Sequence, residues 1–458
     1  MDLQNHSLAK QMQNSSLLNL VSTWMLCFVL LVFASLYGFS FERGSVNQVG
    51  GDVGMGLTAT DSSQSAIVKI QNALCYLICA WLIFPYTKKV LQWAQREVLV
   101  IALLGWIALS VLWSNSPGHS LIGLMRMVID VALALYFVHR YNINEQLKIV
   151  MLVGSIAAFA GLFLVIALPQ YGMFIRSYGL AQSWQGIFGH KNLSGLGMSI
   201  LVLPGFFAKF DTYQGELFRK FYLGIMAVFI VMSHSASAWV VGFSCILTAI
   251  LLNVIGRVRR KEAVLLIGAV AGIVAGVLLV AYINYDAFMK LLGKDPTMTG
   301  RTVLWADLMI SVLKRPLLGY GFCAFWQGLN GESANVIIHM GWTGIGYAEN
   351  GVYELLLEVG AVGVLLYLLI YLRAWKNAVV CFRKGLTPAS KWYISILAFV
   401  LFSNIEAGQL MLPSYLNCIL PFVAYYGLRD EARRVSRQGS PGIVTSQSRL
   451  DQGAISCD

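Results

Sequence analysis

The chain has 458 residues, of which 57% are hydrophobic and only 12% are charged, whereas a soluble protein carries about 25% charged residues. This composition excludes an ordinary water-soluble domain. The net charge of +11 does not indicate nucleic-acid binding, because the basic residues lie in short loops between apolar runs, and no nucleic-acid partner is expected.

Apolar runs recur along the whole chain, and several approach the roughly 20 residues that cross a hydrocarbon core as a helix. Backbone groups in lipid must be hydrogen-bonded within their own segment, so these runs predict helices rather than open strands. The predicted fold class is an all-α polytopic membrane protein with about twelve transmembrane helices. The predicted spans are residues 17–38, 66–84, 97–113, 121–138, 147–168, 192–208, 220–233, 236–255, 263–283, 351–372, 392–406 and 411–427.

The basic residues predict the orientation of these spans. Most of the 33 lysines and arginines fall in alternate connections, as expected when those connections face the cytoplasm. This pattern requires an even number of spans and predicts that both termini are cytoplasmic. The protein is therefore expected to cross the membrane many times, with its chemistry on the non-cytoplasmic side.

The connection between spans nine and ten, residues 284–350, is the longest predicted external segment, and loops of such length usually carry function. Within it, residues 302–315 predict an amphipathic helix with Thr302 as N-cap, and the glycine-rich remainder is predicted to be irregular. The predicted organisation has four parts: spans one to nine in 1–283, the periplasmic loop 284–350, spans ten to twelve in 351–427, and a disordered basic cytoplasmic tail, 428–458.

Cations are scarce in the predicted external segments. Lys191 lies between His190 and Asn192 at the start of span six, Arg176 lies in the preceding loop, and Arg301 precedes the amphipathic helix. Such a cation either anchors the protein at lipid phosphates or binds an anionic lipid-linked substrate. Because Gly, Asn and Thr surround Lys191 and Arg301, substrate binding is the favoured interpretation for these two.

Carboxylates gather at the start of span ten. Glu349 precedes the span, where it is either a solvated carboxylate at a helix start or a general base. Glu354 and Glu358 follow inside apolar sequence, where ionisable groups are functional candidates. His190, His234 and His339 lack metal-ligand spacing, and no phosphate loop or dinucleotide fingerprint occurs, so neither a metal nor a cofactor is expected.

Four stretches have a recognisable spacing between about residues 100 and 370. They are Leu109-Ser110-Val111-Leu112-Trp113-Ser114 with Pro117 and Arg126; Gly186-Ile187-Phe188-Gly189-His190-Lys191-Asn192 with Gly195; Thr299-Gly300-Arg301-Thr302 to Trp305 with Leu318-Gly319-Tyr320-Gly321-Phe322 to Phe325-Trp326; and Glu349-Asn350 with Gly360 and Gly363. In this order they resemble motifs of the O-antigen ligase and Wzy-type polysaccharide polymerase superfamily, particularly its exopolysaccharide-polymerase branch. Glu349 stands where that superfamily usually has His.

The resemblance implies a GT-C-like fold and an inverting glycosyltransferase that polymerises undecaprenyl-pyrophosphate-linked repeat units at the periplasmic face of the bacterial inner membrane. Arg301 and Lys191 would stabilise the pyrophosphate, Glu349 would deprotonate the acceptor hydroxyl, and neither cofactor nor metal would take part. Further substrate-binding residues would be Arg176, His190, Asn192, Asn350, Tyr320, Trp305 and His339. The implied partners are the lipid-linked donor, a lipid-linked or lipid A-core acceptor, membrane lipids, a flippase and a chain-length regulator.

Two alternatives stay open from the sequence. One is an O-antigen ligase that transfers the finished glycan to lipid A-core or to a protein. The other is a transporter of the lipid-linked oligosaccharide without chemistry, which Glu354, Glu358 and Arg126 favour because they lie within predicted spans. The cations clustered beside a long external loop favour an enzyme.

Overall fold

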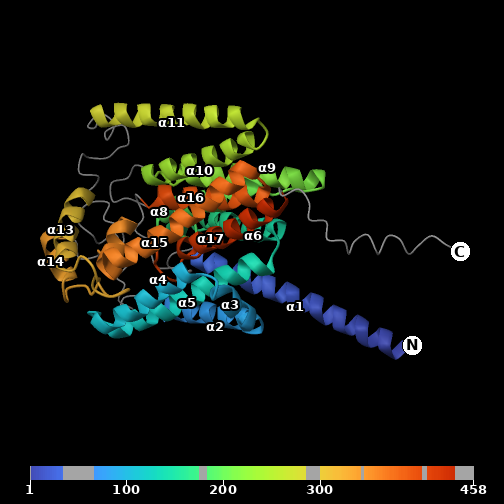
Figure 1. Cartoon of the computed structure of the whole chain (residues 1–458), viewed down its shortest axis with the longest axis horizontal. Coiled ribbons are helices and arrows are strands. Elements are labelled where there is room, and N and C mark those ends of the chain that lie inside the picture. Colours follow the sequence, from blue (N-terminus) through green and yellow to red (C-terminus); the bar gives the residue numbers. More distant parts are fainter. Residues whose placement is uncertain are drawn as a thin grey trace.

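The computed structural model describes residues 2–34, 66–174, 183–284, 300–341, 345–404 and 410–438. Over these residues the molecule is built almost entirely of helices, as Figure 1 shows. A single pair of short antiparallel strands in the described part, β1 (Met173–Phe174) and β2 (Ser183–Trp184), brackets the segment 175–182.

Helices lie at each of the twelve stretches predicted as spans. They are α1 (Asp2–Ala34), α2 (Ala66–Ile83), α4 (Val98–Ser110), α5 (Pro117–Arg140), α6 (Ile143–Ala167), α8 (Lys191–Leu201), α9 (Tyr213–Met232), α10 (Ala236–Ile255), α11 (Arg260–Ile283), α15 (Gly351–Lys384), α16 (Pro388–Ser403) and α17 (Leu416–Gln438). Short pieces extend or connect them: η1 (Phe84–Tyr86), α3 (Thr87–Ala94), η2 (Val111–Trp113), α7 (Pro169–Gly172) and η3 (Leu203–Phe206).

Five stretches among the described residues are long and apolar enough to cross a membrane. They are Lys69–Ala94, Pro117–Arg140, Ile143–Ala167, Ala236–Ile255 and Gly351–Lys384. Leu18–Ala34, Val98–Trp113 and Pro388–Ser403 are shorter apolar helices. Large hydrophobic side chains face outward on many helices, for example Leu265 at 73% exposure, as expected for a surface in contact with lipid. The chain is an all-α polytopic membrane protein, and the number of twelve crossings remains a prediction.

Helix α17 lies at the centre of the bundle and packs against α5, α15 and α16. Buried aromatic side chains fill this centre, among them Trp392, Phe399, Tyr425 and Tyr426. Helix α11 has few neighbours by comparison and runs along one edge of the molecule (Figure 1).

The long predicted loop contains two helices, α13 (Arg301–Lys314) and α14 (Ser333–Met340), which lie together at one end of the molecule (Figure 1). The first residues of α1 lie at the opposite end. Helix α13 confirms the predicted amphipathic helix, but the predicted N-cap was wrong: Gly300 is the N-cap, in a left-handed conformation at φ 82°, and Thr302 lies inside the helix.

Helix α14 contradicts the prediction that the glycine-rich remainder is irregular throughout. Gly331 and Gly341 have positive φ angles of 66° and 65° and flank this helix, so the glycines delimit a short helix instead of preventing one. The predicted boundary at residue 428 also differs, because α17 continues to Gln438. The rest of the predicted tail, 439–458, lies outside the described residues.

Helix α15 is interrupted at Gly360, whose φ of 65° and ψ of −175° are not helical. A Cβ at this position would lie 2.2 Å from the Leu317 carbonyl oxygen, so only glycine fits without movement. The interruption frees backbone groups of α15, and the segment 316–321 hydrogen-bonds to them. The bonds run from Tyr320 N to Leu357 O (2.7 Å), from Gly321 N to Glu358 O (2.9 Å) and from Ala361 N to Pro316 O (2.9 Å).

Candidate functional site

The first turn of α15 orients the residues that precede it. Asn350 is the N-cap, and its Oδ1 accepts hydrogen bonds from the backbone N–H groups of Val352 (2.9 Å) and Tyr353 (3.3 Å). These contacts satisfy orphan donors at the helix start. Asn350, predicted to bind substrate, therefore has a structural contact that explains its presence. Immediately before it, Glu349 has a φ of 52°, a left-handed conformation that non-glycine residues rarely adopt.

Arg301 and Glu349 meet in an ion pair. The Nη2 of Arg301, the first residue of α13, donates to the Glu349 Oε2 at 2.8 Å. The two side chains are only 12% and 13% exposed, so the pair is shielded from most solvent. A charge-assisted contact in such a setting is stronger and better ordered than a surface pair. Separate roles were predicted for these two residues, and the structure shows them in direct contact.

Both backbone polar groups of Ala348 form hydrogen bonds to side chains. Its carbonyl oxygen accepts from Trp305 Nε1 at 3.0 Å, and its N–H donates to Glu354 Oε2 at 2.6 Å. The second Glu354 oxygen accepts from Trp326 Nε1 at 2.9 Å. The Trp305 ring also stacks on Tyr353, with ring centroids 6.0 Å apart. Trp305 and Glu354 thus fix the backbone next to Glu349.

The stretch 109–114, one of the four motif stretches, secures the loop segment that enters the interruption in α15. Trp113 Nε1 donates to the Leu318 carbonyl at 3.0 Å, and Ser110 Oγ accepts from the Phe322 N–H at 3.2 Å. From α5, Ser120 Oγ donates to the Phe322 carbonyl at 2.7 Å. The motifs at 109–114 and 318–326 therefore form a scaffold, while the motifs at 300–302 and 349–350 contribute the charged pair.

The second predicted group of site residues lies at the start of α8. His190 is the N-cap, and its Nδ1 accepts from the Asn192 N–H at 3.3 Å. The Lys191 ammonium lies 5.6 Å from the centroid of the Phe174 ring in β1. Helix α8 packs against α9 and α10, whereas α13 packs against α14 and α15. The structure therefore brings Arg301 and Glu349 together and positions Lys191 on a different element.

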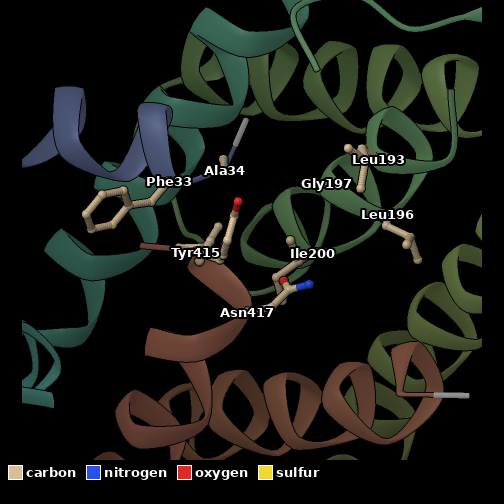
Figure 2. Close-up of a pocket in the computed structure, with 9 residues that line it drawn as sticks. Phe33, Ala34, Leu193, Leu196, Gly197, Ile200, Tyr415 and Asn417 are labelled. Atoms are coloured by element: carbon tan, nitrogen blue, oxygen red, sulfur yellow. The ribbon is translucent and has the colours of Figure 1, made fainter. Parts of the chain in front are cut away.

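Helix α8 also lines a small pocket with α1 and the start of α17, as Figure 2 shows. Most of its lining is apolar, and Tyr415 and Asn417 contribute polar atoms. The lining residues are Phe33, Ala34, Leu193, Leu196, Gly197, Ile200, Tyr415, Leu416 and Asn417. Such a lining suits a hydrocarbon chain better than a sugar.

Three other predicted site residues have different outcomes. Tyr320 is 3% exposed and donates its hydroxyl to the Ser311 carbonyl at 2.8 Å, so its ring offers no surface for sugar stacking, which corrects the predicted binding role. The His339 side chain is 69% exposed and its Nδ1 lies 2.6 Å from Asp307 Oδ2, between α14 and α13. Arg176 lies outside the described residues.

Burial raises the pKa of Tyr320 to about 12, which fits a neutral hydroxyl that donates a hydrogen bond. Within the part of the chain that the structure describes, no group of three or more His, Cys, Asp or Glu side chains could hold a metal ion.

Asp130 was not among the predicted site residues. This residue of α5 is fully buried, and its Oδ2 accepts from the Ser414 N–H at 2.9 Å, which joins α5 to the segment before α17. A carboxylate inside an apolar run was the available signal. The same signal marks Glu354, but the contact between Glu354 and Ala348 depends on a loop folding back onto the helix, which no local pattern predicts.

Two comparisons with known proteins bear on this arrangement. Residues 221–368 match the family described as O-Antigen ligase. The exopolysaccharide production protein ExoQ of Rhizobium meliloti (strain 1021) is 24% identical over 349 residues, which cover 73% of this chain and 78% of that protein. Both findings support a relationship of the chain to the O-antigen ligase and Wzy-type family.

The O-antigen ligase match contains Arg301, Trp305, Glu349 and Glu354, whereas Lys191 lies before it. The family supports an enzyme of ligase or polymerase type, with lipid-linked glycans as substrates and membrane lipids around it. The resemblance deduced from the four motif stretches is confirmed.

Proposed function

We propose that the protein is an inverting glycosyltransferase that polymerises undecaprenyl-pyrophosphate-linked oligosaccharide repeat units into a surface polysaccharide or exopolysaccharide. The proposal rests above all on the shielded pair of Arg301 and Glu349, 2.8 Å apart within the O-antigen ligase match. This pair provides a fixed cation and a proton acceptor side by side. The reaction takes place at the periplasmic face of the bacterial inner membrane.

The chemistry requires one displacement at the anomeric carbon of the donor. The acceptor hydroxyl oxygen forms a bond to that carbon, the bond from carbon to pyrophosphate breaks, and undecaprenyl pyrophosphate leaves with the electron pair. The hydroxyl proton passes to Glu349. A single displacement inverts the anomeric configuration.

Arg301 is suited to stabilise the leaving group. A guanidinium has five N–H donors in a planar fork, and the ion pair with Glu349 uses a donor at Nη2. The same side chain orients the carboxylate and presents a positive charge to the pyrophosphate. Lys191, at the start of α8, contributes a second cation to the anionic substrate, and the small apolar pocket beside α8 has a lining suited to a hydrocarbon segment.

The second candidate is an O-antigen ligase that passes the polymer to lipid A-core or to a protein. The donor and the displacement are the same, and only the acceptor differs. Two observations favour a polymerase: Glu349 stands where ligases usually have His, and the relative from Rhizobium meliloti is named as an exopolysaccharide production protein. A flippase and a chain-length regulator are the further partners of a polymerase.

The contacts of the buried carboxylates in α15 weaken the hypothesis that the protein is a transporter. Glu354, Glu358 and Arg126 were the features that favoured it, yet Glu354 accepts from Ala348 and Trp326, and Glu358 lies next to the Cys323 backbone. Both carboxylates therefore secure the external loop on α15. A transport path would instead need charged groups that exchange partners with a moving substrate.

Deletion of the gene, followed by analysis of surface glycans, tests the proposed function. A polymerase deletion leaves single repeat units, and complementation with the wild-type gene restores long chains. Accumulation of long chains on the lipid carrier would identify the ligase instead. Normal surface glycans in the deletion strain would contradict both enzyme activities.

A further inference from the structure

Glu354 is buried at the first turn of α15, where it is 8% exposed. Both of its oxygens accept hydrogen bonds from N–H groups outside the helix: Oε2 from the Ala348 backbone at 2.6 Å and Oε1 from the Trp326 indole at 2.9 Å. A buried carboxylate is stable only when such donors replace water. Glu354 therefore ties two parts of the external loop to one point on α15.

One of these two parts adjoins the candidate catalytic carboxylate. Ala348 is the residue before Glu349, and its two backbone polar groups are both held, the N–H by Glu354 and the carbonyl by Trp305. Glu349 itself has a φ of 52°. A left-handed conformation at a non-glycine residue persists only where the surroundings enforce it, and such conformations cluster at active sites.

We propose that Glu354 is a positioning residue, which holds the Ala348 peptide so that the Glu349 side chain faces Arg301. The inference rests on the proposed function in giving Glu349 the role of the base. Glu354 acts through the backbone of residues 348 and 349 and does not touch the reacting atoms. In its absence the Ala348 N–H has no carboxylate to hold it, and the left-handed turn at Glu349 can relax.

Glu358 provides a matched control on the same helix. It lies four residues after Glu354, is 4% exposed, and is next to the backbone of Cys323, whereas Glu354 contacts Ala348. If the protein needed only a buried carboxylate on this face of α15, substitutions of Glu354 and of Glu358 would have the same effect. A specific effect on Glu349 would follow only from the change at Glu354.

The first experiment measures the position of residue 349 without reference to activity. Glu349→Cys is introduced alone, with Glu354→Gln and with Glu358→Gln, and the alkylation rate of the new thiol by a water-soluble maleimide is measured in membranes. The same chains without Glu349→Cys report the labelling of native cysteines, of which Cys323 is the partly exposed member among the described residues. Glu354→Gln should raise the rate several-fold, and Glu358→Gln should leave it unchanged. Equal rates in all three chains would overturn the inference.

The second experiment measures turnover with lipid-linked repeat units. Glu354→Gln should lower kcat about 10- to 100-fold, because a misplaced catalytic group loses its reactive geometry, while the KM of the donor stays near the wild-type value. Glu358→Gln should retain most of kcat. Trp305→Phe, which removes the other contact to Ala348 and keeps an aromatic ring against Tyr353, should lower kcat in the same way.

The proposed function and the positioning role of Glu354 can be contradicted independently of each other. If Glu349→Gln keeps wild-type turnover, the proposed function loses its base, whereas faster alkylation in Glu354→Gln would still show that Glu354 positions residue 349. If Glu349→Gln is inactive while Glu354→Gln shows wild-type kcat and unchanged alkylation, the positioning role is wrong and the proposed function stands.

Discussion

Arg301 and Glu349 lie 48 residues apart in the sequence and meet at 2.8 Å, with both side chains largely shielded from solvent. The contact joins the first residue of α13 to the residue before the N-cap of α15. The loop between α11 and α15 is thereby fixed to the helix bundle at the point where the candidate chemistry occurs. Each partner of this pair can be tested by a conservative change.

Arg301→Lys keeps the positive charge and removes the planar fork of donors. An ammonium cannot hold Glu349 and a phosphate oxygen with the same geometry, so we expect kcat/KM to fall about 100-fold in an assay with lipid-linked repeat units. Arg315→Lys, at the end of α13, is the control and should change kcat/KM less than about twofold. Wild-type kcat/KM in Arg301→Lys would show that only a charge is needed there.

Glu349→Gln and Glu349→His separate the two possible requirements at this position. Glutamine has nearly the shape of glutamate but cannot accept the proton, so product formation should fall by at least about 100-fold. Histidine restores a proton acceptor, and we expect measurable polymer in the same assay. Inactive Glu349→His together with folded protein would mean that the carboxylate charge beside Arg301 is required.

The sequence predicted the helices well, because apolar runs of sufficient length leave a chain in lipid few alternatives to a helix. It also selected both members of the ion pair, since an external cation and a carboxylate at a helix start are conspicuous in such a chain. It did not predict the contact between them, because that contact depends on how the loop returns to α15. The errors at Thr302 and in the glycine-rich region have a common origin. Glycines in left-handed conformations begin or flank helices there, whereas glycine in a sequence pattern is usually interpreted as a residue that disrupts helices.

Gly360→Ala should be strongly destabilising. The side chain would meet the Leu317 carbonyl oxygen at 2.2 Å in a backbone conformation with φ of 65°, so we expect a loss of at least about 2 kcal/mol. Thermal unfolding in detergent measures the effect. Gly105→Ala is the matched control, because this glycine lies inside α4 and an added methyl group would meet nothing within 4 Å, so it should be neutral or slightly stabilising. A thermal midpoint in Gly360→Ala equal to that of Gly105→Ala would contradict the interruption in α15.

The stabilisation that the contact between α13 and the start of α14 provides should depend on pH. Burial alone would raise the pKa of Glu332, but hydrogen bonds from Lys314 (2.6 Å) and Ser311 (3.1 Å) outweigh it and lower the pKa below its ordinary value. The stabilisation is therefore complete above the unfolded pKa, about 4.3, and is lost as the pH falls through the lower folded pKa.

The expected size is small, at most about 1 kcal/mol, because Lys314 is half exposed. Thermal midpoints of wild type and Glu332→Gln should differ at pH 6, and the difference should shrink towards about pH 3.5, below the unfolded pKa. A difference that grows as the pH falls would have the wrong sign and would contradict a stabilising role for the pair.

The most direct test of the central claim uses the purified protein in lipid vesicles with undecaprenyl-pyrophosphate-linked repeat units as both donor and acceptor. Product is separated by chain length, and released undecaprenyl pyrophosphate is measured. Wild type should form a ladder of polymers with one carrier released per added unit, and Glu349→Gln should form none while remaining folded. A ladder from Glu349→Gln equal to that of wild type would show that the pair of Arg301 and Glu349 is not the catalytic centre.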